Sequence, residues 1–156
     1  MRVSSVRYKF IQHFSIPTRE AFDWCTDYQP GDLALMGEEG KRRITRVTSD
    51  TVILEEDVVQ GDKKVSKVKL VKLNRPALSW HNIQLQGPNK YSEFIYEIVP
   101  ESPYKSRLIF TGLLLVYSTK SISRQRLRQI ANTEKGYDSS AWKRLAKTMA
   151  EELRKA

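Results

Sequence analysis

The sequence predicts an α+β fold in which a seven-stranded, curved antiparallel sheet wraps around a long C-terminal helix, with two short helices after the first strand. Three observations lead to this prediction. An alternating segment precedes a short aromatic one, six strand-like segments joined by short turns follow, and an amphipathic segment comes last. A single antiparallel sheet can cover the apolar stripe of one long helix by curling around it.

The first strand is expected at residues 6–16, where aromatic and aliphatic residues alternate with polar ones. Pro17 and Glu20 mark the start of a short helix, because proline suits the first turn and an acid is favourable close behind it. Pro30 ends this segment, and residues 33–37 are expected to form one more helical turn.

Six further strands are expected, joined by turns short enough to make neighbouring strands antiparallel. They are residues 42–47, 51–58, 65–73, 78–85, 91–99 and 106–117. The third of these segments and the turn before it carry many lysines, which is typical of a strand at the edge of a sheet. These lysines are Lys63, Lys64, Lys67, Lys69 and Lys72.

The C-terminal helix is expected to begin at Asp138, because Asp138-Ser139-Ser140 offers an N-cap. Its apolar residues recur at i, i+3, i+4, i+7 and i+11, which predicts one buried stripe. They are Trp142, Leu145, Ala146, Met149 and Leu153. No repeat, low-complexity tract or linker interrupts the chain, so residues 1–156 are expected to form a single domain.

The composition is that of a globular protein and argues against a disulfide-bonded or membrane-spanning one. Of the 156 residues, 40% are hydrophobic, which is enough for a core, and a single cysteine excludes an internal disulfide. The first residues contain no continuous apolar stretch, and the longest apolar run, residues 113–117, is too short to span a bilayer. The sequence therefore predicts a cytoplasmic protein.

Positive charge is concentrated late in the chain. Residues 118–156 hold ten Lys/Arg and four Asp/Glu, so they contribute +6 of the net +9. Within them, the basic segment 119–135 could be a lid, a contact for an anionic membrane or nucleic acid, or an ordinary solvated helix that packs by one face. Nucleic acid is disfavoured, because aromatic residues are not interleaved with the basic ones.

Several short motifs together resemble one known superfamily. They are a strand-to-helix corner at residues 15–24, a helix exit at 27–30, a late strand pair at 96–100 and 106–110, and a helix start at 138–142. Their order is similar to that of the START-like (SRPBCC), helix-grip superfamily, which includes polyketide cyclases and dehydratases, pollen-allergen-type carriers and coenzyme Q-binding proteins. The resemblance covers nearly the whole chain. The long basic stretch departs from it, since many relatives run directly into the final helix.

The resemblance implies a hydrophobic small molecule or lipid held between the sheet and the C-terminal helix. Some members of the superfamily are enzymes, but here we expect binding without catalysis and without a cofactor. An anionic membrane surface is a further partner to consider. Two alternatives stay open. One is a polyketide cyclase or dehydratase-like enzyme that uses Glu56, His81 or Tyr96 as its titratable group. The other is a module that binds acidic partners through residues 119–135.

The candidate ligand-binding residues are those expected to face the helix. Charged residues in the late strands should face water, so their neighbours face inward. Asn82 and the Tyr96 hydroxyl would supply polar groups in a mostly apolar lining, although the same residues could also simply fill a core. Gly112, in mid-strand, indicates a bend or a close approach to the backbone. The full set is Leu78, Trp80, Asn82, Phe94, Tyr96, Phe110, Gly112, Leu114, Trp142, Leu145 and Met149.

No catalytic or metal-binding residue is predicted. Cys25 has no spacing that pairs it with either histidine, and a lone cysteine among aromatic residues is usually a small buried hydrophobe. The two histidines show no metal-ligand spacing. Glu56 is expected to share a strand face with Val52 and Leu54, where a carboxylate could act as an acid or base only if its pKa were raised.

Overall fold

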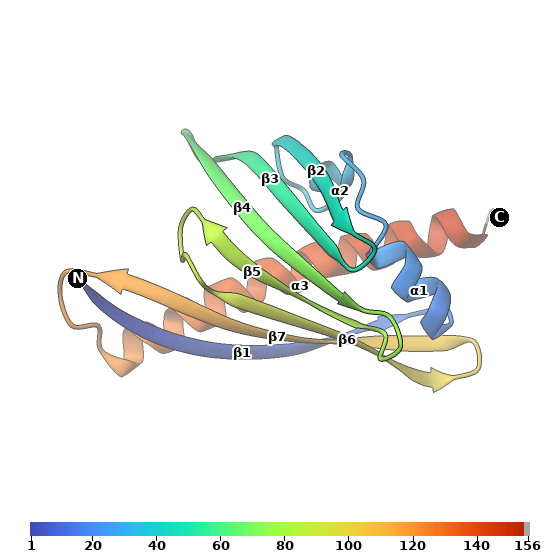
Figure 1. The fold of residues 1–156 in the computed structure, drawn as a ribbon. Coiled ribbons are helices and arrows are strands. Elements are labelled where there is room, and N and C mark those ends of the chain that lie inside the picture. Colours follow the sequence, from blue (N-terminus) through green and yellow to red (C-terminus); the bar gives the residue numbers. More distant parts are fainter. Residues whose placement is uncertain (155–156) are drawn as a thin grey trace.

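The structure is a computed structural model that describes residues 1–154, and it confirms the predicted fold class (Figure 1). Seven strands and three helices follow one another within these residues. They are β1 (Arg2–Phe14), α1 (Thr18–Cys25), α2 (Asp32–Leu35), β2 (Gly40–Thr48), β3 (Thr51–Gln60), β4 (Lys63–Asn74), β5 (Ser79–Gln86), β6 (Glu93–Ser102), β7 (Lys105–Ser118) and α3 (Arg124–Arg154).

All seven strands belong to one antiparallel sheet with the order β1-β7-β6-β5-β4-β3-β2. Only β1 leaves the sequential order, because it pairs with β7 and so brings the start of the chain beside the last strand. The sheet curls around α3, which runs along its concave face, while α1 lies at one end (Figure 1). The concave face and the helix therefore enclose the core.

The pairing of β1 with β7 explains the glycine in mid-strand. Gly112 lies directly opposite Tyr8, and a Cβ atom added to Gly112 would lie 2.5 Å from Cζ of the Tyr8 ring. Such a distance is far inside van der Waals contact. The expected close approach to Gly112 is thus made by a side chain of the neighbouring strand, Tyr8.

The expectation that the lysine-rich strand forms an edge is wrong. β4 lies inside the sheet, between β3 and β5. Lys67 and Lys69 are partly buried and share the concave face with Val71, because alternate residues of a strand point to the same side. Lysines placed there meet the buried carboxylate of Glu56 on β3, a partner that the linear pattern did not reveal.

The start of the last helix was also predicted wrongly. α3 begins at Arg124, where the Ser123 hydroxyl accepts a hydrogen bond from the Arg126 backbone N–H at 3.1 Å. The basic segment therefore forms the first turns of the same helix. Gly136 interrupts it only weakly, since a helical glycine costs about 1 kcal/mol relative to alanine. No helix in residues 1–154 is long and apolar enough to cross a membrane.

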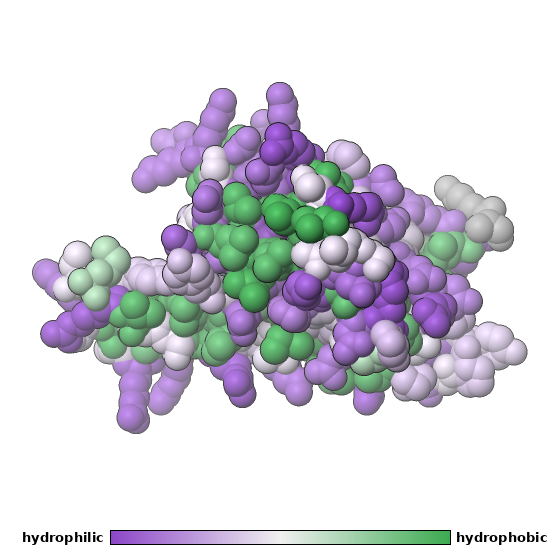
Figure 2. Space-filling view, viewed as in Figure 1, coloured by the Kyte–Doolittle hydropathy of each residue, from purple (hydrophilic) through white to green (hydrophobic). Residues whose placement is uncertain are grey.

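The convex face of the sheet also carries apolar side chains. Ile53, Leu70 and Ile83 stand in register across β3, β4 and β5, and all three are partly exposed. Figure 2, which views the molecule from this side, shows an apolar area over the centre of the sheet. Apolar residues on both faces explain why the alternation in the middle strands is weaker than in β1.

Candidate ligand-binding site

Aromatic rings fill one part of the concave face. Trp80 of β5 stacks on Tyr96 of β6 with ring centroids 4.8 Å apart, and Trp142 of α3 lies 5.8 Å from Tyr96. Phe110 of β7 meets the same tyrosine edge-on at 5.1 Å. Phe22 of α1 lies 5.7 Å from Trp80. These rings contact one another in the geometries that aromatic pairs prefer, so this part of the predicted lining is packed core.

Polar side chains lie beside this aromatic cluster. Asn82 follows Trp80 on the same face of β5, and its Nδ2 donates to the Tyr96 hydroxyl at 3.4 Å. The Asn82 Oδ1 atom is buried and has no hydrogen-bond partner within residues 1–154. Native proteins leave few buried polar atoms unpaired, and such an atom often marks the place of a water or ligand donor.

A second polar pair joins the sheet to the helix. The Tyr8 hydroxyl donates to Asp138 Oδ2 at 2.5 Å. Burial, helped by the nearby Glu134 carboxylate, raises the pKa of Asp138 to about 6, although the hydrogen bond from Tyr8 opposes the rise. Burial and the Asp138 charge raise the pKa of Tyr8. Asp138 can therefore exchange a proton close to neutral pH while Tyr8 keeps its own.

A network of charges lies on the concave face of β2, β3 and β4. The Arg42 Nε donates to Glu56 Oε2 at 2.7 Å, and Arg42 also reaches Asp32 of α2 at 3.4 Å. Lys69 Nζ lies 2.8 Å from Glu56 Oε1 but is not aligned as a hydrogen bond, so its attraction is mainly Coulombic. Burial alone would raise the pKa of Glu56, but Lys69 and Arg42 outweigh it and hold the pKa at about 2.

Lys67 of β4 and Glu134 of α3 continue this polar region toward the helix. Burial, together with the charge of Lys69, lowers the pKa of Lys67. Burial also raises the pKa of Glu134, and Lys67 partly offsets that rise. The concave face thus has two parts, an aromatic one near α1 and Trp142 and a polar one near Asp138 that holds charges of both signs.

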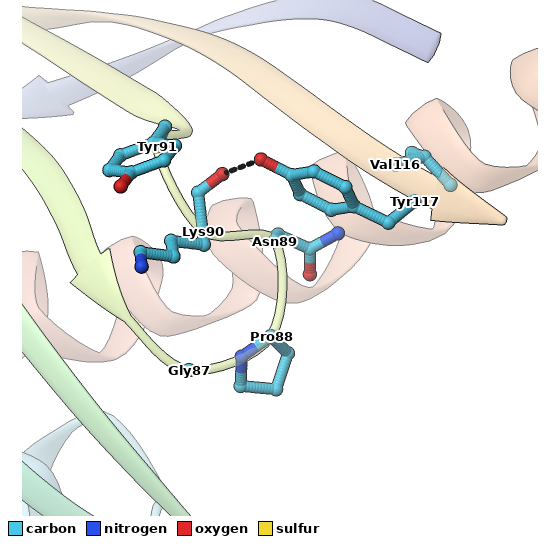
Figure 3. A pocket seen from close by; sticks show the side chains of 7 residues that line it. All are labelled: Gly87, Pro88, Asn89, Lys90, Tyr91, Val116 and Tyr117. Atoms are coloured by element: carbon cyan, nitrogen blue, oxygen red, sulfur yellow. Dashed lines mark hydrogen bonds between the residues drawn. The ribbon is translucent and has the colours of Figure 1, made fainter. Parts of the chain in front are cut away.

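Among the hollows on the described surface are two that are lined by neither Asn82 nor Asp138. The first, of about 540 Å³, lies at the turn between β5 and β6 (Figure 3). There the Tyr117 hydroxyl donates to the Lys90 carbonyl at 2.6 Å. The lining residues are Gly87, Pro88, Asn89, Lys90, Tyr91, Val116 and Tyr117.

The second hollow, of about 350 Å³, lies on the convex face between β4, β5 and β6. His81 and Ile95 contribute to it, and they stand opposite each other in the β5–β6 pairing. The second hollow includes the core residue Trp80, and Val116 of the first hollow packs against the same buried apolar cluster. The first hollow lies where the turn between β5 and β6 meets the end of β7.

The structure gathers most of the predicted lining residues around one core. Of the eleven, eight contribute to its apolar cluster, either buried or packed against it, namely Leu78, Trp80, Phe94, Tyr96, Phe110, Leu114, Trp142 and Met149. Asn82 joins them through Tyr96, and Gly112 lies under Tyr8. Leu145 is buried on α3 but does not belong to this cluster.

The sequence did not reveal most of the polar residues that other elements, apart from the late strands, direct toward this core. Asp138 was interpreted as a helix cap, and Tyr8 as one of several apolar residues in the first strand. Glu56 was correctly expected on the inner face, where it is buried. A signal for Tyr8 existed, since a mid-strand glycine often lies opposite a large side chain. Arg42 and Lys67 gave no such signal, because exposed strands carry similar residues.

The cysteine and the histidines do not form a site together. Burial raises the pKa of the Cys25 thiol, whereas His13 pairs with the Glu101 carboxylate at the surface and His81 lines the hollow on the convex face. Within residues 1–154, no three His, Cys, Asp or Glu side chains come together so that they could hold a metal ion.

Comparisons with known proteins give matches in structure and none in sequence. No protein-family model matches the chain, and no curated protein matches it significantly. The Zhui aromatase/cyclase from Streptomyces sp. R1128 superposes with a TM-score of 0.80 at 9% identity, covering 96% of each chain. The protein TTHA0849 from Thermus thermophilus gives 0.74 at 16% identity, covering 95% of this chain and 98% of that one.

A third match is norcoclaurine synthase from Thalictrum flavum, in a complex with dopamine and hydroxybenzaldehyde. Its TM-score is 0.70 at 12% identity, covering 96% of this chain and 88% of that one. Identities this low establish the fold and leave the activity open. The order of elements, the sheet that curls around α3 and these superpositions agree: the chain has the helix-grip fold of START-like (SRPBCC) proteins.

Proposed function

We propose that the protein binds a hydrophobic small molecule or lipid between the sheet and α3, with a polar group of the ligand at Asn82. The observation that carries the proposal is the buried Asn82 Oδ1, which lacks a donor within residues 1–154. Leaving such an oxygen unpaired costs about 1–3 kcal/mol. A hydroxyl or amine of a bound molecule would remove that cost.

The surroundings of Asn82 favour a ring system as the ligand. Tyr96 offers a hydroxyl beside Asn82, while Phe94 is only half-buried and lies 6.1 Å from Phe110. Leu114 continues the apolar surface on β7. Ligand sites are typically apolar with a few oriented polar groups, which suits an aromatic or alicyclic molecule bearing one hydroxyl. The other predicted lining residues stay predictions.

Equilibrium dialysis with 2-naphthol and naphthalene tests this proposal, since the two probes differ by one hydroxyl group. We expect the wild-type protein to bind 2-naphthol more tightly. The Asn82→Leu variant should lose about 3- to 10-fold of that preference, which corresponds to one hydrogen bond. The variant also loses the hydrogen bond from Asn82 Nδ2 to the Tyr96 hydroxyl, so circular dichroism should first show that it is folded.

His81→Leu is the matched control, since His81 is the neighbouring residue on the opposite face of β5. It should leave the preference for 2-naphthol unchanged. Absence of binding by both probes would overturn the proposed function. Binding of both probes with no effect of Asn82→Leu would overturn the role of Asn82 alone.

A second candidate function is acid–base catalysis of the cyclase type, and the observation that favours it is the raised pKa of Asp138. Of the three groups considered from the sequence, Glu56 is held ionised by cations, His81 lies on the convex face, and Tyr96 has its pKa raised by burial. Asp138 suits the task better, because burial raises its pKa to about 6 and Tyr8 orients it.

Proton exchange in 2-tetralone tests this candidate. Asp138 would take an α-proton from the ketone to leave an enolate, and return a deuteron from D₂O to the same carbon. NMR should show faster exchange with the wild-type protein than with Asp138→Asn. Equal rates for the two proteins, at equal binding of the ketone, would remove the catalytic candidate.

A further inference from the structure

Chain segments that contain cations but no acidic residue meet at one end of the molecule. Residues 1–19, 86–92 and 102–133 contain no Asp or Glu. We call the cations at this end the basic tip; they are Arg2, Lys90, Lys120, Arg124, Arg126 and Arg128. The three arginines of α3 are exposed, whereas Leu127 and Ile130 of the same helix pack against the core.

Contacts among distant segments hold the tip together. Arg2 pairs with Ser118 across β1 and β7, and its guanidinium donates to the Ser121 hydroxyl before α3. The Tyr117 hydroxyl donates to the Lys90 carbonyl in the turn between β5 and β6. Figure 1 shows the N-terminus, the end of β7 and the start of α3 at the same end of the molecule. The cations therefore form one surface.

Exposed apolar side chains lie among these charges. Val3 stands opposite Tyr117 across β1 and β7, and the two are 55% and 37% exposed. Tyr91 is 55% exposed, and Lys90 Nζ lies 4.9 Å above its ring centre. Figure 2 shows hydrophobic and hydrophilic residues side by side at this end. The surface thus combines charge with aliphatic and aromatic groups.

We propose that the basic tip docks on an anionic lipid membrane. Anionic headgroups attract clustered Lys and Arg, and the affinity rises about fivefold for each cation near the surface. Tyrosine is favoured at the membrane–water interface, and Val3 gains by entering the acyl boundary. A nucleic acid would be attracted by the same charges, but it offers no apolar layer for Val3.

The position of the first hollow suggests how a ligand could enter a docked protein. It opens at the tip, between the β5–β6 turn and Val116, and Val116 packs against the core. A docked protein would present this hollow to the bilayer, which gives a hydrophobic ligand a path that avoids water. This route rests on the proposed function, whereas docking itself does not, so the two can fail separately.

Flotation of the 156-residue chain with vesicles tests the docking. One set of vesicles contains phosphatidylcholine alone and the other contains about one-third phosphatidylserine. We expect binding only to the second set, and a steep loss of binding as NaCl rises from about 50 to about 200 mM. Reversing two charges with Arg124→Glu and Arg128→Glu should lower binding at least about tenfold.

The double variant Lys143→Glu and Lys147→Glu is the matched control. Both residues are exposed on the same helix, four positions apart, and the net charge changes equally. It should keep most of the binding. Tyr91→Ser should weaken binding, whereas Tyr104→Ser, at the exposed β6–β7 turn, should not.

Three results would overturn the docking proposal. They are equal binding to both vesicle sets, equal losses in the two charge-reversal variants, and tighter binding to single-stranded DNA that depends on Arg124 and Arg128. Circular dichroism should show every variant folded, since all these positions are exposed. Loss of vesicle binding with retained 2-naphthol binding would separate this proposal from the proposed function.

Discussion

Tyr8 of β1 donates a hydrogen bond to Asp138 of α3 at 2.5 Å, and so joins residues 130 positions apart in the chain. Asp138 is largely buried, and its pKa is raised to about 6. A carboxyl whose pKa is higher in the folded state binds its proton more tightly there. The folded state therefore loses stability as the pH rises from about 4 to about 6.

Asp138→Asn should remove this loss, because the amide is neutral and its oxygen still accepts from Tyr8. We expect the variant to match the wild-type stability near pH 4 and to exceed it by about 1–3 kcal/mol near pH 7.5. Urea unfolding at both pH values measures the difference. The charges nearest to Asp138 are Glu134 on the same helix and Lys67 and Lys69 on β4, and all are present in both proteins.

Asp27→Asn is the control for that experiment. The pKa of Asp27 is also raised to about 6, by burial and by the neighbouring Asp32. Asp27 is nevertheless an exposed residue, so solvent screens its charge. Its substitution should shift stability by less than about 0.5 kcal/mol. If Asp138→Asn shows the same pH dependence as the wild-type protein, Asp138 does not titrate in this range.

Glu56→Gln should destabilise the protein by about 3–5 kcal/mol, because the buried Arg42 loses its closer carboxylate partner and keeps only Asp32, at 3.4 Å, while Lys69 loses its own. The Arg42 side chain is only 5% exposed. Glu55→Gln is a neighbouring control, since Glu55 pairs with Arg43 at the surface and should cost less than about 1 kcal/mol. Equal costs for the two substitutions would contradict the assignment of a buried network.

The same network predicts a loss of stability in acid. The pKa of Glu56 is held near 2, below its ordinary value, so the folded state favours the ionised form. This contribution is present above about pH 4.5 and is lost as the pH falls toward 2. The wild-type protein should lose more stability over that interval than Glu56→Gln does, as measured by thermal unfolding.

Gly112→Ala should destabilise the protein by about 1–3 kcal/mol, since the new methyl group would overlap the Tyr8 ring. In the Tyr8→Ala background the same substitution should cost less, and the double-mutant cycle measures this coupling. Gly136→Ala is the control, because nothing lies within 4 Å of a Cβ at that helical position. It should stabilise the protein by about 0.5–1 kcal/mol. A Gly112→Ala variant as stable as the wild-type protein would rule out the Tyr8 overlap.

Cys25 should react slowly with Ellman's reagent in the native protein, because burial raises the pKa of its thiol and so keeps the reactive thiolate scarce. Unfolding in urea should release one reactive thiol per chain. Rapid reaction of the native protein near pH 7.5 would show instead that Cys25 is accessible and activated.

The sequence by itself determined the type of architecture. The spacing of apolar residues distinguishes strands from helices, and this spacing can be read within each short segment. Alternation in the strands, short turns and the stripe from Trp142 to Met149 were enough to predict the antiparallel sheet and the covering helix, but not the pairing of β1 with β7. The same reasoning placed Asn82, Tyr96 and Glu56 on the inner face, since every second residue of a strand shares a side.

Only the tertiary structure decided which side chains meet. Asp138 resembled a helix cap until α3 was found to begin at Arg124 and to bring it against Tyr8. Lys67 and Lys69 resembled edge protection until β4 was found inside the sheet, facing Glu56. The physical reason is that burial and ion pairing depend on residues far apart in the sequence, which the curvature of the sheet brings together. A local sequence pattern does not say which of these residues will be neighbours in space.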